Sequence, residues 1–105
     1  MSWLQYEVFR VVGLRSESAV DLALVLQDDT LSHLSTRLVA PLIPVEGNLV
    51  IDRATPVIDV AGNEYVVAIH LMTALPTRNL GKLVTRIIDN ERQIKNALDL
   101  VFFGV

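Results

Sequence analysis

The sequence has no cysteine, few aromatic residues and no excess of positive charge. Without cysteine, disulfide bonds, thiolate zinc sites and a cysteine nucleophile are all excluded. Nine lysine and arginine residues against twelve aspartate and glutamate residues give a formal charge of −3 at pH 7. Non-specific binding to phosphate backbones depends on a basic excess, so a direct nucleic-acid partner is not expected.

The chain also lacks a long hydrophobic run. One of its longest, residues 65–72, is interrupted by His70 and falls well short of the roughly 18 residues that span a bilayer. The N-terminal residues Met-Ser-Trp-Leu-Gln-Tyr-Glu contain no basic region followed by an apolar segment, as a signal peptide would. We therefore expect a cytoplasmic protein with no membrane partner.

What the chain does have is a large apolar fraction for its size. Its 105 residues suit a single domain over residues 1–105, and 51% of them are hydrophobic. The mean hydropathy is +0.44. So much apolar side chain is hard to bury in one small core, so part of it is expected in a subunit or partner interface.

Alternating and continuous apolar segments predict five or six antiparallel strands. Residues 61–63, Ala-Gly-Asn, predict a hairpin turn between two of these segments. Pro41 and Pro44 require a bulge or an edge position, because proline has no N–H to donate. Residues 80–83 are expected to form a connector. The expected strands cover residues 3–12, 19–26, 36–43, 55–60 and 64–72.

The last segment changes to a helical period. From Ile87 onward, apolar residues recur every three or four positions, with polar residues between them. Asp89 and Glu91 suit the first turn, where carboxylates interact favourably with the helix dipole. Gly104 stands where a C-terminal capping glycine would. The sequence therefore predicts a mainly β, α+β or small-barrel domain with one C-terminal helix.

Two adjacent phenylalanines occupy the last turn of this helix. Neighbouring helical residues are about 100° apart, so both rings cannot face the core. The spacing from Ile94 and Leu98 predicts that Phe102 is buried and that Phe103 is exposed beside Asp99. An exposed aromatic here is either a frayed terminus or an anchor for a partner.

No constellation in the sequence indicates catalysis, a metal or a cofactor. His33 and His70 are isolated, and no P-loop, GxSxG or HExxH motif is present. We expect His33 in a polar loop and His70 partly buried in a strand. Asp28 and Asp29 are adjacent acids that suit a solvated turn better than a catalytic pair. We therefore expect a protein that is not an enzyme.

Five blocks of the sequence, in order and at matching spacing, resemble the CcdB family, the gyrase-poisoning toxins of ccd toxin–antitoxin modules. The most specific is Ile94-Lys95-Asn96-Ala97, followed by two aromatic residues and a terminal glycine–aliphatic pair. The other four blocks are Leu26–Asp29, Arg37–Leu42, Pro56–Ile58 and Met72–Pro76. Together they extend the resemblance over nearly the whole chain.

The resemblance implies an SH3-like barrel with a C-terminal helix, assembled as a homodimer. It also implies a toxin that traps the A subunit of DNA gyrase on cleaved DNA and is neutralised by a partly disordered, CcdA-like antitoxin. In the family, the last aromatic stacks on a gyrase arginine. Founding members carry Trp at position 103, Asn at 99 and Ile at 30, where this chain has Phe, Asp and Thr.

Three sets of site residues follow as expectations. The gyrase-binding set is Phe103, Gly104, Val105, Asp99, Thr30 and Leu31. The antitoxin-binding set is Gln27, Asp28, Asp29 and Leu31. The dimer axis is expected near Val101.

Two other functions stay open at this point. One is a non-toxic relative that only binds antitoxin, since positions 30, 99 and 103 depart from the family. The other is an endoribonuclease of the MazF/Kid type, which has the same fold but requires basic and acid–base side chains in a groove.

Overall fold

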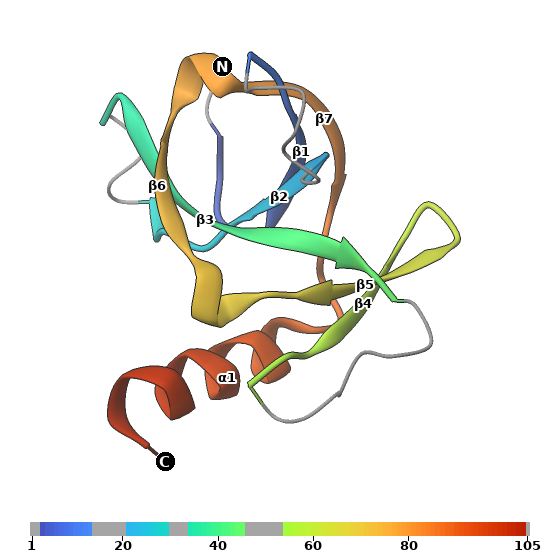
Figure 1. Cartoon of the computed structure of the whole chain (residues 1–105), viewed down its shortest axis with the longest axis vertical. Coiled ribbons are helices and arrows are strands. Elements are labelled where there is room, and N and C mark those ends of the chain that lie inside the picture. Colours follow the sequence, from blue (N-terminus) through green and yellow to red (C-terminus); the bar gives the residue numbers. More distant parts are fainter. Residues whose placement is uncertain (1–2, 14–20, 30–33, 46–53, 105) are drawn as a thin grey trace.

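A curled antiparallel sheet, closed on one side by a helix, makes up most of the protein (Figure 1). The computed structural model describes residues 3–13, 21–29, 34–45 and 54–104. Within these ranges the elements are, in order, β1 (Glu7–Val11), β2 (Leu22–Val25), β3 (Thr36–Pro44), β4 (Val57–Val60), β5 (Asn63–Val67), η2 (Ile69–Leu71), β6 (Thr73–Pro76), η3 (Thr77–Asn79), β7 (Leu80–Arg86) and α1 (Glu91–Phe103). The predicted mainly β fold with one C-terminal helix is confirmed.

The strands are ordered β4-β5-β3-β2-β1-β7, and β3 is shared between two partners on one side. The first half of β3 pairs with β6, and its last three residues pair with β5. Pro41 lies between these two pairings, where its carbonyl oxygen accepts a hydrogen bond from the Ala68 N–H at 3.0 Å. In a strand, the N–H and C=O of one residue point toward the same neighbouring strand. The position where Pro41 has no N–H to donate therefore faces the interruption between the pairings with β6 and β5.

The sheet buries apolar side chains on both faces. One cluster lies between the sheet and α1, and the other lies on the opposite face, where Trp3 and Leu75 pack against it. Residues alternate between the clusters along β2 because successive strand side chains point to opposite faces. This explains why all four residues of β2 are buried. No helix among the described residues is long and apolar enough to cross a membrane.

The predicted hairpin is confirmed, whereas the strand around His70 is not. Ala61 and Gly62 join β4 to β5 with φ angles of 53° and 88°, the left-handed conformation that tight hairpin turns require. The second strand ends at Val67, well before the predicted Met72. The chain then forms the short 3₁₀ helix η2, so His70 is exposed and lies outside any strand.

Two further expectations were wrong at the edge of the sheet. Residues 80–86 form strand β7, not a connector, because they pair with β1 from Glu7 to Val11. This brings the described strands to seven. The predicted strand over residues 3–12 begins only at Glu7, because Tyr6 has a φ of 65° and turns the chain.

Candidate partner-binding surface

The first half of helix α1 packs against the core, and its second half extends beyond the core. Ile94 and Ala97 are fully buried in the cluster beneath the sheet, and Glu91 lies in the first turn. The helix ends at Gly104, whose φ of 73° is left-handed and whose N–H donates to the Leu100 carbonyl oxygen at 2.9 Å. The predicted helix and its glycine cap are therefore confirmed. Asp89, which was also expected in the first turn, instead precedes the helix, because the helix begins at Glu91.

The last turn of α1 exposes both phenylalanines. Phe102 is 61% exposed and Phe103 is 76% exposed, with ring centroids 6.3 Å apart. The prediction that Phe102 is buried was wrong for the single chain. The helical period continues to Phe102, but the end of α1 projects past the strands in Figure 1, and the Phe102 ring stays largely exposed.

The charge around these rings is negative. Asp99 is half-buried one turn before Phe103, and the last turn contains no basic residue. The unpaired carbonyls at the end of a helix add a partial negative charge. Two exposed aromatic rings beside a carboxylate form a surface that suits a cationic side chain such as arginine.

The segment after β2 holds the second set of predicted site residues. The Gln27 side-chain oxygen accepts a hydrogen bond from the Leu38 N–H at 3.4 Å. The Asp29 carboxylate accepts one from the Gln5 N–H at 2.7 Å. Asp28 and Asp29 are both exposed. The predicted residues Thr30, Leu31, His33 and Val105 lie outside the described residues.

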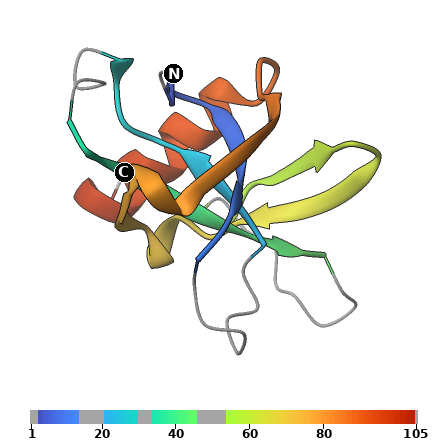
Figure 2. The same cartoon turned by 90° about the horizontal axis from the view of Figure 1, so that it is seen from above.

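Within the single chain, the segment after β2 and the end of α1 are separate. In Figures 1 and 2, the segment after β2 and the end of α1 lie on the same side of the molecule, but they do not meet. Asp99, Phe103 and Gly104 are together at the helix end, whereas Gln27 and Asp28 lie next to β2. A binding surface that includes both groups therefore has to be completed by a second copy or by the partner itself.

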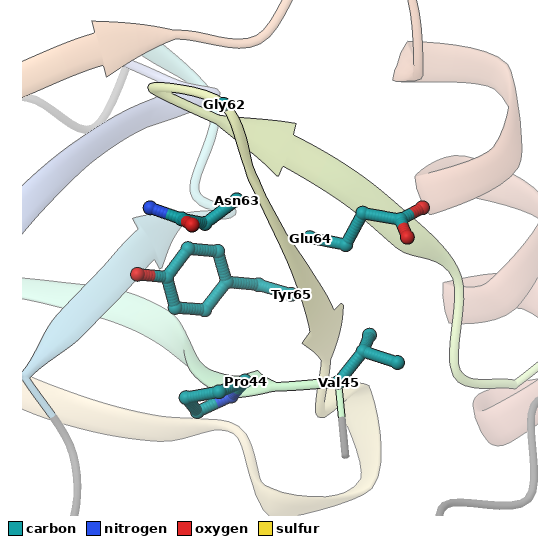
Figure 3. A pocket seen from close by; sticks show the side chains of 6 residues that line it. All are labelled: Pro44, Val45, Gly62, Asn63, Glu64 and Tyr65. Carbon is teal, nitrogen blue, oxygen red and sulfur yellow. The ribbon is translucent and has the colours of Figure 1, made fainter. Parts of the chain in front are cut away.

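A hollow at the β4–β5 hairpin also brings polar side chains together (Figure 3). It measures about 480 Å³ and is lined by Pro44, Val45, Gly62, Asn63, Glu64 and Tyr65. Figure 3 shows the Asn63 amide and the Tyr65 ring on one side of β5 and the Glu64 carboxylate on the other. Because Glu64 points away from the other two, the three groups do not converge on one ligand.

Sequence reasoning missed the role of one charged residue, Arg37. It is 2% exposed, and its Nε donates to the Trp3 carbonyl oxygen at 3.1 Å. The guanidinium lies 5.7 Å from the centre of the Trp3 ring and also donates to the carbonyl oxygens of Leu34 and Thr36. The available signal was an arginine at an inward-facing position of a predicted strand. Among the described residues, no cluster of His, Cys, Asp or Glu could hold a metal ion.

Comparison with known proteins gives a consistent fold. The family model described as "CcdB protein" matches residues 5–104. An endoribonuclease from a mycobacterial species, solved in complex with its cognate antitoxin, has a TM-score of 0.76 at 16% identity over 97% of this chain and 95% of its own. The Mycobacterium tuberculosis toxin MazF-mt6 has a TM-score of 0.72 at 18% identity over 91% of this chain and 95% of its own. At these identities the two structures establish a shared fold only.

Proposed function

Because the chain belongs to the CcdB protein family, we propose that it is the toxin of a type II toxin–antitoxin module and binds the A subunit of DNA gyrase. In this proposal the toxin stabilises gyrase on cleaved DNA and performs no chemistry itself. The observation that supports it most strongly is the end of α1. Phe102 and Phe103 are both exposed there, next to Asp99 and the negative end of a helix.

This surface matches what the proposed target offers. Exposed aromatic side chains are the residues most often found at the energetic centre of an interface. The Phe103 ring can stack on an arginine, while the Asp99 carboxylate is close enough along the helix to neutralise it. Phe stacks on cations less strongly than Trp, so the chain is proposed as a weaker binder than relatives with Trp at this position.

We propose a homodimer in which α1 and η2 meet their symmetry copies. Leu71 on η2 is 52% exposed, and Val101 on α1 is also exposed, although η2 packs against α1 within the chain. A two-fold interface brings one patch against itself, so these apolar side chains would be covered and the two helix ends presented together. Light scattering at micromolar concentration should give twice the 11.6 kDa chain mass, and the monomer mass would overturn this part.

An antitoxin tail is the second proposed partner. The solved mycobacterial neighbour is a complex with its cognate antitoxin, and the residues Gln27, Asp28 and Asp29 form an acidic, amide-bearing segment on this chain. We propose that the tail binds along this segment and the dimer groove. Its binding would lower the affinity for gyrase, because both partners share one dimer surface.

The proposal is tested by titrating the protein with purified gyrase A subunit. Micromolar or tighter binding that weakens about 30-fold in Phe103→Ala supports it. A protein that binds an antitoxin tail but not gyrase A would instead be the non-toxic relative. A protein that cuts RNA without gyrase would be the endoribonuclease, and either result would overturn the gyrase proposal.

A further inference from the structure

The first described residues form a tight turn directly before β1. The Leu4 N–H donates to the Glu7 carboxylate at 2.6 Å, and the Glu7 N–H donates to the Leu4 carbonyl oxygen at 3.1 Å. Tyr6 lies inside this turn with a φ of 65°, a conformation that costs free energy in any residue other than glycine. We call residues Trp3–Glu7 the N-terminal brace.

The brace is bonded to the segment that follows β2. The Gln5 N–H donates to the Asp29 carboxylate at 2.7 Å, and the Gln5 side-chain amide donates to the Leu26 carbonyl oxygen at 3.0 Å. One residue thus contacts both ends of Leu26–Asp29. The Tyr6 N–H donates to the Val25 carbonyl oxygen at 2.7 Å and so fixes the exit from β2 as well.

The same brace also supports the start of β3 and the start of α1. The Trp3 carbonyl oxygen and ring both contact the buried Arg37, which in turn donates to the carbonyl oxygens of Leu34 and Thr36. The Tyr6 carbonyl oxygen accepts a hydrogen bond from the Ile87 N–H at 2.8 Å, just before the helix. The brace is therefore bonded to three separate parts of the chain, and one of them, the segment after β2, holds candidate site residues.

We propose that the N-terminal brace fixes the geometry of the segment Gln27–Asp29 for partner binding, with Gln5 and Arg37 as positioning residues. This rests on the proposed function for the identity of the partner, but the geometry can be tested without one. A segment ordered before binding loses less conformational entropy when the partner arrives, so its affinity is higher. The strained conformation of Tyr6 is maintained because hydrogen bonds on both sides of the residue require it.

Gln5→Ala removes the side-chain bond to Leu26 and leaves the backbone bond to Asp29. Amide exchange of residues 27–29 in the free protein should rise about fivefold, and affinity for a peptide of the proposed antitoxin tail should fall about fivefold. This factor corresponds to about 1 kcal/mol, the net value of one hydrogen bond. Trp3 is the only tryptophan, so its emission reports a change in the brace directly.

The matched control is Asn79→Ala. The Asn79 amide donates to the Val12 carbonyl oxygen at 2.8 Å, which is the same kind of bond at the other end of β1. Because this bond is exposed, Asn79→Ala should lower the melting temperature by no more than Gln5→Ala does. It should leave both the exchange of residues 27–29 and the affinity for the antitoxin-tail peptide unchanged. In the free protein, Asp29→Asn should keep the Gln5 backbone N–H protected from exchange, because the side-chain oxygen at position 29 still accepts its hydrogen bond. Asp29→Ala should remove this protection, because no such oxygen remains.

The proposal for the brace would be overturned if amide exchange of residues 27–29 were unchanged in Gln5→Ala. It would also be overturned if Asn79→Ala accelerated the exchange of these residues as much as Gln5→Ala does. Failure of the unmodified protein to bind gyrase A would instead refute the proposed function. The exchange comparison would still decide the brace in that case, because it requires no partner.

Discussion

Truncating Phe103 should separate partner binding from folding. The residue is 76% exposed, so about a quarter of it is buried within the chain. Full burial of such a side chain stabilises a protein by about 1.5–3 kcal/mol, so Phe103→Ala should cost only about 0.4–0.7 kcal/mol of folding free energy. For a domain of this size that lowers the melting temperature by about 2–5 °C.

The loss in binding should be much larger. An aromatic residue at the centre of an interface contributes roughly 2 kcal/mol or more, which is about a 30-fold rise in Kd for gyrase A. Thermal melts and a binding titration on the same samples measure both quantities. Ile88→Ala is the control, because Ile88 is 71% exposed but lies before the helix and far from its end. Ile94→Ala, at a fully buried position, should instead cost about 2–5 kcal/mol of stability.

Either of two outcomes would refute this reasoning about Phe103. One is a loss of stability as large as that of Ile94→Ala, which would mean that the ring is buried in the folded protein. The other is an unchanged Kd for gyrase A, which would mean that the binding surface lies elsewhere on the chain.

Three further changes have defined outcomes. Phe103→Trp should lower the Kd for gyrase A, because the indole ring stacks more strongly on cations, and a raised Kd would contradict this. Tyr6→Phe should reduce the loss of folding stability at alkaline pH. Burial, and then the nearby Glu91, raises the pKa of Tyr6 in the folded protein. The stability that this raised pKa contributes is therefore present below about pH 10 and is lost as the pH rises through the folded-state pKa. Urea unfolding at pH 7 and pH 11 measures this, and an equal alkaline loss in both proteins would refute it. Arg37→Lys should lower the free energy of unfolding in urea by about 3 kcal/mol, because one ammonium cannot replace the hydrogen bonds to the carbonyl oxygens of Trp3, Leu34 and Thr36. A decrease below about 1 kcal/mol would show that these hydrogen bonds contribute little to stability.

The features that the sequence predicted correctly are those with a local cause. The turn at Ala61 and Gly62 needs residues that tolerate a left-handed backbone, and those residues are recognisable one at a time. Helix α1 has a 3.6-residue period and a capping glycine within one segment. The exposure of Phe103 follows from the same period.

The features that were missed depend on distant parts of the chain. Strand β7 is a strand because it pairs with β1, more than 60 residues earlier, and no alternation within 80–86 indicates this. Phe102 continues the helical pattern, but whether a core exists to receive it depends on where the sheet ends. The N-terminal brace depends on a left-handed Tyr6, a conformation that no neighbouring residue predicts.

The central claim is that this protein acts on gyrase through the end of α1 and cuts no RNA. The most direct measurement incubates supercoiled plasmid with gyrase and the protein, traps cleaved complexes with detergent, and runs an RNA digestion without gyrase in parallel. We predict that linear plasmid accumulates with the unmodified protein, that it does not with Phe103→Ala at the same concentration, and that the RNA stays intact. Intact plasmid together with cleaved RNA would contradict the account.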